Sequence, residues 1–129
     1  MNDWYTTEIA QNPHTSPDIL RKILEEGKDD WISHYAANNP NCPPELLKMV
    51  LERGNDDGVS IYASRNPNCP PELLKMILEK GNNDWVSWNV IGNPNCPSDA
   101  IIKWEKVIRN EVEGIEEASE VKGEVLEVF

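Results

Sequence analysis

The chain lacks the features that mark secreted and membrane-spanning proteins. None of its apolar runs approaches the ~20 residues that a membrane-spanning helix needs. Its first residues, Met1–Trp4, have no basic start followed by an apolar stretch, which a signal peptide requires. The sequence therefore predicts a cytoplasmic protein that does not bind membranes.

Basic residues are also scarce. Twelve Lys and Arg stand against 23 Asp and Glu, so the formal net charge is −11. Residues 110–129 hold seven Glu and one Lys, and thus more than half of that net charge. Nucleic acids are bound largely through Lys and Arg, so no nucleic-acid partner is expected. We interpret the acidic tail as a solvated segment, with binding to a basic protein as the alternative.

What the chain does contain is an internal repeat of 27 residues. The segment 39–54, NPNCPPELLKMVLERG, returns at 66–81 with two substitutions, and shorter copies occur at 12–17 and 93–97. A fixed period of this size is typical of proteins whose successive units stack into a solenoid. The period divides the chain into four repeats: 1–27, 28–54, 55–81 and 82–108.

Each repeat begins with an acidic pair, or its equivalent, and a short first helix. Asp30, Asp57 and Asp84 suit helix N-caps, where a carboxylate accepts an orphan backbone N–H. Calcium also binds converging oxygens, but capping explains these acidic pairs better. The helix ends at an Asn-Pro pair, because the residue before a proline is disfavoured in the α region. The recurring asparagines predict a hydrogen-bonded ladder between consecutive turns: Asn12, Asn39, Asn66 and Asn93.

The second helix of each repeat starts at the Cys-Pro-Pro-Glu segment. We expect Thr15 or Cys42 at the cap, with prolines in the first turn, where a missing N–H costs nothing. An apolar stripe from Leu46 to Leu51 predicts the face that packs in the core. A glycine then closes the helix, since glycine adopts a positive φ without strain. These glycines are Gly27, Gly54 and Gly81.

The fourth repeat has Ile108 in place of the closing glycine. Its apolar stripe, with Ile101 and Trp104, continues past the repeat, so we expect a longer final helix that caps the stack and ends near Glu113. Residues 114–129 then form an acidic tail that packs back as a cap or stays mobile. The predicted fold is all-α: a short α-solenoid of four two-helix repeats over residues 1–113.

The repeated Asn-Pro-x-x-Pro-Pro-Glu-Leu-Leu core, preceded by Asp-Trp-(Ile/Val)-Ser, resembles the leucine-rich repeat variant family. More loosely, it resembles HEAT-type α-solenoids. The resemblance covers residues 1–108 and implies a right-handed superhelix that serves as a binding or scaffold module without catalytic residues. Family members linked to iron–sulfur clusters hold them on a cysteine-rich segment outside the repeats. This chain has no such segment, so no cofactor is expected.

The cysteines and histidines offer no arrangement for metal binding or catalysis. Cys42, Cys69 and Cys96 share one repeat position, and stacked helices lie ~8–10 Å apart. That is too far for a disulfide, which needs Cα atoms within ~7 Å, or for one shared zinc ion. We expect three structural, free thiols. His14 and His34 fall at different repeat positions and no catalytic motif is present, so neither a metal site nor an enzyme is predicted.

The aromatic residues are the candidates for partner binding. Trp4, Trp31 and Trp85 share one repeat position, at which the third repeat has Gly58. Two interpretations are open: the rings fill the seams between repeats, which we favour, or some of them line an exposed face, where Trp and Tyr are frequent anchors. Under the second interpretation the partner-binding residues are Trp4, Trp31, His34, Tyr35, Tyr62, Trp85 and Trp88.

Three functions follow from these patterns. The first is a non-enzymatic scaffold module that binds a protein or peptide along one face. The second is an acidic inhibitor or nucleic-acid mimic that occupies a basic site on a partner protein. The third is self-association through the first repeat, which has no polar cap.

Overall fold

The computed structural model describes the backbone of residues 6–119 and the side chains of residues 6–110. Within residues 6–119 it contains eight α-helices and no strand, so the predicted all-α class is confirmed. The helices are α1 (Thr7–Gln11), α2 (Pro17–Glu25), α3 (Trp31–Ala37), α4 (Pro44–Glu52), α5 (Gly58–Arg65), α6 (Pro71–Glu79), α7 (Trp85–Ile91) and α8 (Ser98–Ser119).

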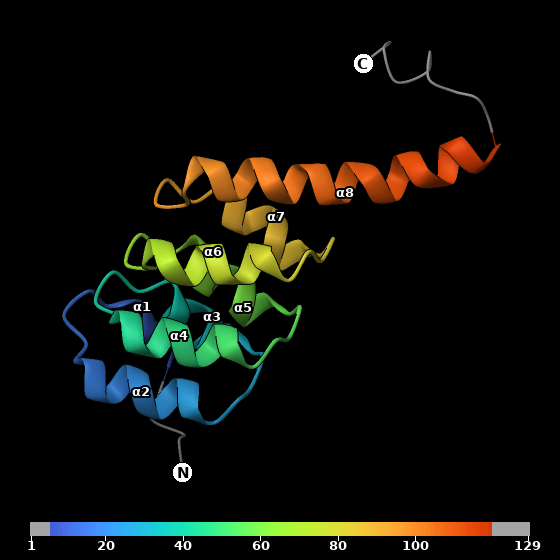
Figure 1. The fold of residues 1–129 in the computed structure, drawn as a ribbon. Helices are drawn as coiled ribbons and strands as arrows, with labels where there is room; N and C mark the ends of the chain where they lie inside the picture. The colour runs from blue at the N-terminus through green and yellow to red at the C-terminus, as the bar shows by residue number, and fades with distance from the viewer. Residues whose placement is uncertain (1–5, 120–129) are drawn as a thin grey trace.

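The helices form two rows (Figure 1). The short helices α1, α3, α5 and α7 make up one row, in which each helix contacts the next. The longer helices α2, α4, α6 and α8 are stacked in the same order beside them. Helices α2, α4 and α6 also contact the short helix that follows them in the chain. Each 27-residue unit of the sequence thus supplies one helix to each row.

Aspartates begin three of the short helices, as predicted. Asp30, Asp57 and Asp84 each accept a hydrogen bond from the backbone N–H three residues further on, at 2.9, 3.0 and 2.9 Å. The bond satisfies one of the donors that a helix N-terminus leaves without an intrahelical partner. Capping therefore accounts for the second aspartate of each acidic pair.

The caps expected at Thr15 and Cys42 are wrong by one residue. Ser16 caps α2, and its Oγ accepts a hydrogen bond from the N–H three residues on at 3.3 Å. Pro43 holds the same place in α4, without a side-chain cap. Thr15 and Cys42 are buried instead, and the Thr15 hydroxyl donates to the Ile9 carbonyl oxygen at 2.6 Å. This position faces the core, which explains its small side chains.

Three glycines close the longer helices as predicted. Gly27, Gly54 and Gly81 have φ angles of 73°, 75° and 73° and directly follow the C-caps of α2, α4 and α6. An L-residue with a Cβ is strained in this left-handed region. Glycine thus turns the chain out of each helix toward the next short helix.

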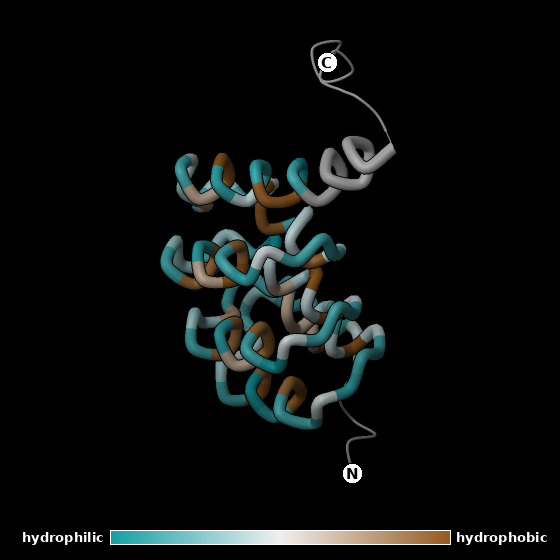
Figure 2. The backbone as a smooth tube through the Cα atoms, turned by 45° about the vertical axis from the view of Figure 1, so that its right-hand side comes forward, coloured by the Kyte–Doolittle hydropathy of each residue, from teal (hydrophilic) through white to brown (hydrophobic). Residues whose placement is uncertain are grey.

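The core lies where the two rows meet. Leu46, Leu47 and Val50 are fully buried, as their stripe along α4 predicted. In the row of short helices, Ala36 and Ala63 are also fully buried, and their small side chains let neighbouring helices approach closely. Hydrophobic and hydrophilic segments accordingly alternate along the helices in Figure 2.

The final helix is longer than the sequence indicated. We expected α8 to end near Glu113, but it continues through Gly114 to Ser119. A glycine inside a helix costs only about 1 kcal/mol relative to alanine, which is too little to end a helix between good helix formers. Helix α8 packs on α6 at the C-terminal end of the rows (Figure 1). Of the predicted tail, residues 120–129 lie outside the described residues.

Candidate interaction surface

The asparagines join consecutive turns through their side chains. The Nδ2 group of Asn66 donates to the carbonyl oxygens of Ala37 and Asn39 at 2.8 and 3.0 Å. Its Oδ1 accepts from the N–H of Asn68 at 2.9 Å. Asn39 and Asn93 make the equivalent bonds one unit earlier and later, and all three are buried. The hydrogen-bonding capacity of these side chains is thus used inside the protein.

The first copy of this turn is more exposed. Asn12 lies at the surface, and its Oδ1 accepts from the N–H of His14 at 2.8 Å. Its carbonyl oxygen accepts from the side chain of Asn39 at 2.9 Å. His14 is exposed as well and belongs to this turn.

A second asparagine ladder runs beside the first, and our sequence reasoning missed it. The side chains of Asn41, Asn68 and Asn95 donate to carbonyl oxygens one unit earlier. For Asn68 the acceptors are Pro40 and Cys42, at 2.7 and 2.9 Å. The signal was present, since the second asparagine of Asn-Pro-Asn recurs in three repeats.

The cysteines lie against these turns as buried, free thiols. Burial, with a smaller contribution from the negative charge of Glu45, raises the pKa of Cys42 to about 12. Burial likewise raises the pKa of Cys69 to about 12 and raises that of Cys96. These groups are protonated at neutral pH, and a thiol reacts as a nucleophile only in its thiolate form.

The aromatic residues behave differently, because three of the described tryptophans face outward, while the two described tyrosines of α3 and α5 are half-buried against the core. Trp31 and Trp85, the first residues of α3 and α7, are 64% and 69% exposed, and Trp88 is 49% exposed. The favoured interpretation, that the rings fill the seams, is therefore wrong for these tryptophans. The fully buried side chains of the short helices α3 and α5 include the small residues Ala36 and Ala63. Trp4 lies outside the described residues.

Ring contacts connect the aromatic side chains of α3 with those of α5. The ring centroid of Trp31 lies 5.4 Å from that of His34 and 6.2 Å from that of Tyr35. His34 continues the chain of contacts to Tyr62, at 5.4 Å, and the guanidinium of Arg65 lies 5.8 Å from the Tyr62 ring centroid. We call the following residues the aromatic face: Trp31, His34, Tyr35, Tyr62, Trp85 and Trp88.

His34 explains the glycine that interrupts the tryptophan series. A Cβ atom at Gly58 would lie 2.5 Å from His34 Nε2, closer than any real Cβ contact. The ring is held there by Asp29, whose Oδ1 lies 2.6 Å from Nε2 and also accepts from the N–H of Val59 at 2.9 Å. The third repeat therefore has glycine at this position because the side chain of the preceding repeat occupies the space.

The same contacts shift the pKa of the Asp29 carboxyl group. Partial burial raises its pKa, but the hydrogen bonds to His34 and to the Val59 N–H, with the charge of His34, lower it by more. The net effect is a pKa below the ordinary value of 3.8. The carboxylate thus stays charged at the edge of the aromatic face.

Among the described tryptophans, Trp104 is buried between helices. It is 1% exposed, and its Nε1 donates to the carbonyl oxygen of Asn82 at 2.7 Å. The rings of Trp88 and Trp104 meet edge to face with centroids 4.9 Å apart. Trp88 is further fixed by a 2.8 Å hydrogen bond from its Nε1 to Asn83 Oδ1. Trp88 is thus partly a structural residue, whereas Trp85 is not.

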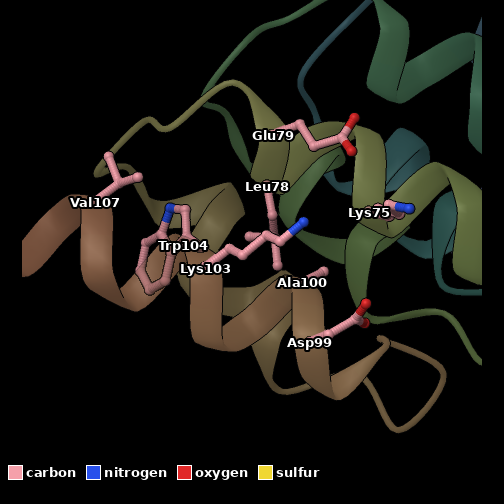
Figure 3. A pocket seen from close by; sticks show the side chains of 8 residues that line it. All are labelled: Lys75, Leu78, Glu79, Asp99, Ala100, Lys103, Trp104 and Val107. Atoms are coloured by element: carbon pink, nitrogen blue, oxygen red, sulfur yellow. The ribbon is translucent and has the colours of Figure 1, made fainter.

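A cavity of about 120 Å³ lies between α6 and α8 (Figure 3). Ala100 stands there at the repeat position that Leu46 and Leu73 occupy, and its smaller side chain leaves space beside Trp104. The cavity is lined by Lys75, Leu78, Glu79, Asp99, Ala100, Lys103, Trp104 and Val107. It is large enough for one apolar side chain, and its charged residues of both signs present no catalytic arrangement.

In the part of the chain that the structure describes, no three His, Cys, Asp or Glu side chains converge as metal ligands would. No helix within that part is both long enough and apolar enough to cross a membrane. Comparisons with protein families, with characterised proteins and with solved structures found no match to this chain.

Proposed function

We propose that the chain is a non-enzymatic, cytoplasmic scaffold module that binds a protein or peptide along the aromatic face. The observation that carries the proposal is the exposure of Trp31 and Trp85 at equivalent places in two repeats. Contiguous apolar patches on a protein surface mark interaction sites, and ring contacts join Trp31 to His34 and Tyr35. Tryptophan is also the residue type most enriched among the side chains that dominate interface energies.

The proposal includes the architecture: a short right-handed α-solenoid of four two-helix repeats, like that of the leucine-rich repeat variant family. Hydrogen bonds that recur from one 27-residue unit to the next support it. The asparagine ladders join groups 26 to 29 positions apart, and the N–H groups of Val59 and Val86 donate to Asp29 and Asp56, 30 positions earlier. Such stacking would set the tryptophans in line along one side.

The test compares proteins captured from a cell extract by three forms of the immobilised chain. These are the unchanged chain, the variant Trp31→Ala/Trp85→Ala, and the control Met76→Ala/Ile102→Ala, which removes exposed apolar side chains from α6 and α8. We expect the tryptophan variant to lose captured proteins that the control retains. Loss from both variants, or from neither, contradicts binding through the aromatic face.

An acidic inhibitor is the second candidate, because residues 110–129 carry seven Glu and one Lys. Replacing the seven Glu by Gln keeps the length of the chain and removes the charge. If capture then disappears and the tryptophan variant captures normally, the acidic segment is the binding element. The described part of the chain gives less support to self-association through the first repeat, since its large exposed hydrophobic residues lie on α3, α6, α7 and α8.

A further inference from the structure

Charge is divided unevenly between the two rows of helices. Over residues 6–109, the segments that contain the short helices hold six acidic and two basic residues, whereas the segments with the longer helices hold nine of each. The short-helix segments are 6–12, 28–39, 55–66 and 82–93, and the others are 13–27, 40–54, 67–81 and 94–109. The whole negative excess of these residues therefore lies on the row that bears the aromatic face.

Part of this charge is next to the exposed rings. Asp30 and Asp84 directly precede Trp31 and Trp85, and each carboxylate uses its Oδ1 to cap its helix. Arg65, the one basic residue of the described short helices, lies at the opposite end of α5 from the capping Asp57. Its guanidinium lies 5.8 Å from the Tyr62 ring centroid, so this cation of the chain stands over the Tyr62 end of the aromatic face, whereas Trp31 and Trp85 directly follow aspartates.

We propose that the occupant of the aromatic face is a basic peptide segment whose Lys or Arg side chains lie over Trp31 and Trp85. This inference rests on the proposed function and specifies the chemistry of the partner. A cation over an indole gains about 0.5–1 kcal/mol at an exposed site, and a neighbouring carboxylate adds a charge pair. A neutral segment gains only the ring contact, and an acidic segment is repelled.

The positions of the helices set the spacing of the two cations. Trp31 and Trp85 begin α3 and α7, which both contact α5, so they are separated by two helix-to-helix steps of ~8–10 Å each. An extended peptide advances about 3.3 Å per residue, so roughly six residues cover this distance. Residues i and i+6 of an extended chain also point to the same side. The partner segment thus carries its two cations six positions apart.

The experiment measures binding of the full-length chain to three synthetic peptides by titration calorimetry. All are twelve residues long and neutral apart from two positions, 4 and 10, which hold Arg in the first peptide, Gln in the second and Glu in the third. We expect the Arg peptide to bind at least tenfold more tightly than the Gln peptide, and the Glu peptide to bind least. A fourth peptide with Arg at positions 4 and 7 is expected to bind more weakly than the first.

Two matched protein variants separate local charge from net charge. Asp30→Asn/Asp57→Asn/Asp84→Asn removes three charges beside the aromatic face and keeps the helix caps, since asparagine caps as well as aspartate. Glu25→Gln/Glu72→Gln/Glu105→Gln removes three charges from exposed sites on α2, α6 and α8. We expect the first variant to bind the Arg peptide about tenfold more weakly and the second to stay within about twofold.

The outcomes distinguish this inference from the proposed function. Equal binding of the Arg and Gln peptides, or equal affinity of the two variants, overturns the basic occupant. If Trp31→Ala/Trp85→Ala nevertheless abolishes binding of both peptides, the aromatic face remains a binding surface for a neutral partner. If none of the peptides binds, the basic occupant is overturned as well, and the capture experiment decides the proposed function alone.

Discussion

The asparagine turns and the aromatic face belong to the same repeats but differ in how uniform they are. Asn39, Asn66 and Asn93 are identical, buried and bonded to the preceding turn. The first position of the short helices instead changes from Trp31 to Gly58 and back to tryptophan at residue 85, with both indoles exposed. The asparagines that hold one turn to the next are therefore constant here, whereas the first position of the short helices varies, with tryptophans that face solvent and a glycine that leaves room for a neighbouring ring.

The largest loss of stability is expected when the asparagine turns are disrupted. Asn66→Ala removes two donors from carbonyl oxygens and one acceptor from the Asn68 N–H, all within a buried turn. Each group left unsatisfied costs about 1–3 kcal/mol. The carbonyl of Asn39 keeps its bond from the N–H of Cys42 at 2.9 Å, so we expect a total loss of about 2–4 kcal/mol in urea-induced unfolding.

Asn12→Ala is the matched control for this substitution. Asn12 occupies the same repeat position but is exposed, so we expect its replacement to cost less than about 1 kcal/mol. Equal losses for Asn12 and Asn66 would mean that the bonds to the preceding turn are not what stabilises the repeats.

A smaller loss of stability is expected at Gly58, which stands where the neighbouring repeats have tryptophan. Gly58→Ala brings a Cβ against the ring of His34, and such overpacking costs about 1–3 kcal/mol. In a His34→Ala background the same change is expected to stabilise by up to about 1 kcal/mol, because alanine is the better helix former. Chemical denaturation of the four proteins in this double-mutant cycle measures the coupling.

Gly54→Ala is the contrasting substitution, at one of the glycines that close the longer helices. No atom outside its immediate neighbours would lie within 4 Å of a Cβ at this position. The expected loss of about 1 kcal/mol in unfolding free energy therefore comes from the φ angle of 75°. This loss should be the same with histidine or alanine at residue 34. If His34→Ala rescued both glycine variants equally, the ring contact would not be the reason for Gly58.

Stability should change little when the exposed tryptophans are removed. Trp31→Ala and Trp85→Ala are each expected to lower the free energy of unfolding by no more than about 0.5 kcal/mol. Trp104→Ala, at 1% exposure, is expected to cost about 3–5 kcal/mol. Thermal unfolding followed by circular dichroism checks both, and a large loss for Trp85→Ala would assign that ring to the core.

The smallest effect concerns the charge of Asp29. Its pKa is lower in the folded chain than the ordinary 3.8, so its contribution to stability is present above that value and is lost as the pH falls through the folded pKa. The side chain is 43% exposed, so solvent screening limits the contribution to a few tenths of a kcal/mol. The stability difference between the unchanged chain and Asp29→Asn should therefore shrink toward zero between pH 5 and about pH 2 in urea titrations. A difference that stays constant with pH would contradict this origin.

The sequence predicted those features that depend on local backbone chemistry. Aspartate caps, Asn-Pro stops and left-handed glycines act within a few residues, so Asp57, Asn66 and Gly81 are found as expected. The all-helical class followed from the same signals. The second ladder is visible in the sequence as an asparagine that recurs at residue 68 and its equivalents. Its bonds to the preceding turn could not be predicted, because they depend on the distance between stacked turns.

The exposure of the tryptophans was not predictable in this way. Whether an indole fills a seam depends on how closely two helices approach, and that distance is set by residues elsewhere, among them Ala36 and Ala63. The same tertiary effect places Trp104 inside and Trp85 outside, although both are tryptophans in apolar-patterned segments. The end of α8 was missed because one glycine was treated as a stop when its cost is small.

The asparagine ladders also have a consequence for folding kinetics. Their bonds span only 26 to 29 positions, so each unit is bonded to its immediate neighbour and contact order stays low. Chains of this kind fold quickly for their size, because little loop-closure entropy is lost before contacts form. Under the proposed solenoid architecture the chain also opens from its ends, because an outer unit has a neighbour on one side only. Amide hydrogen exchange should accordingly be slowest in α4 and α5, with protection falling toward either end of the stack.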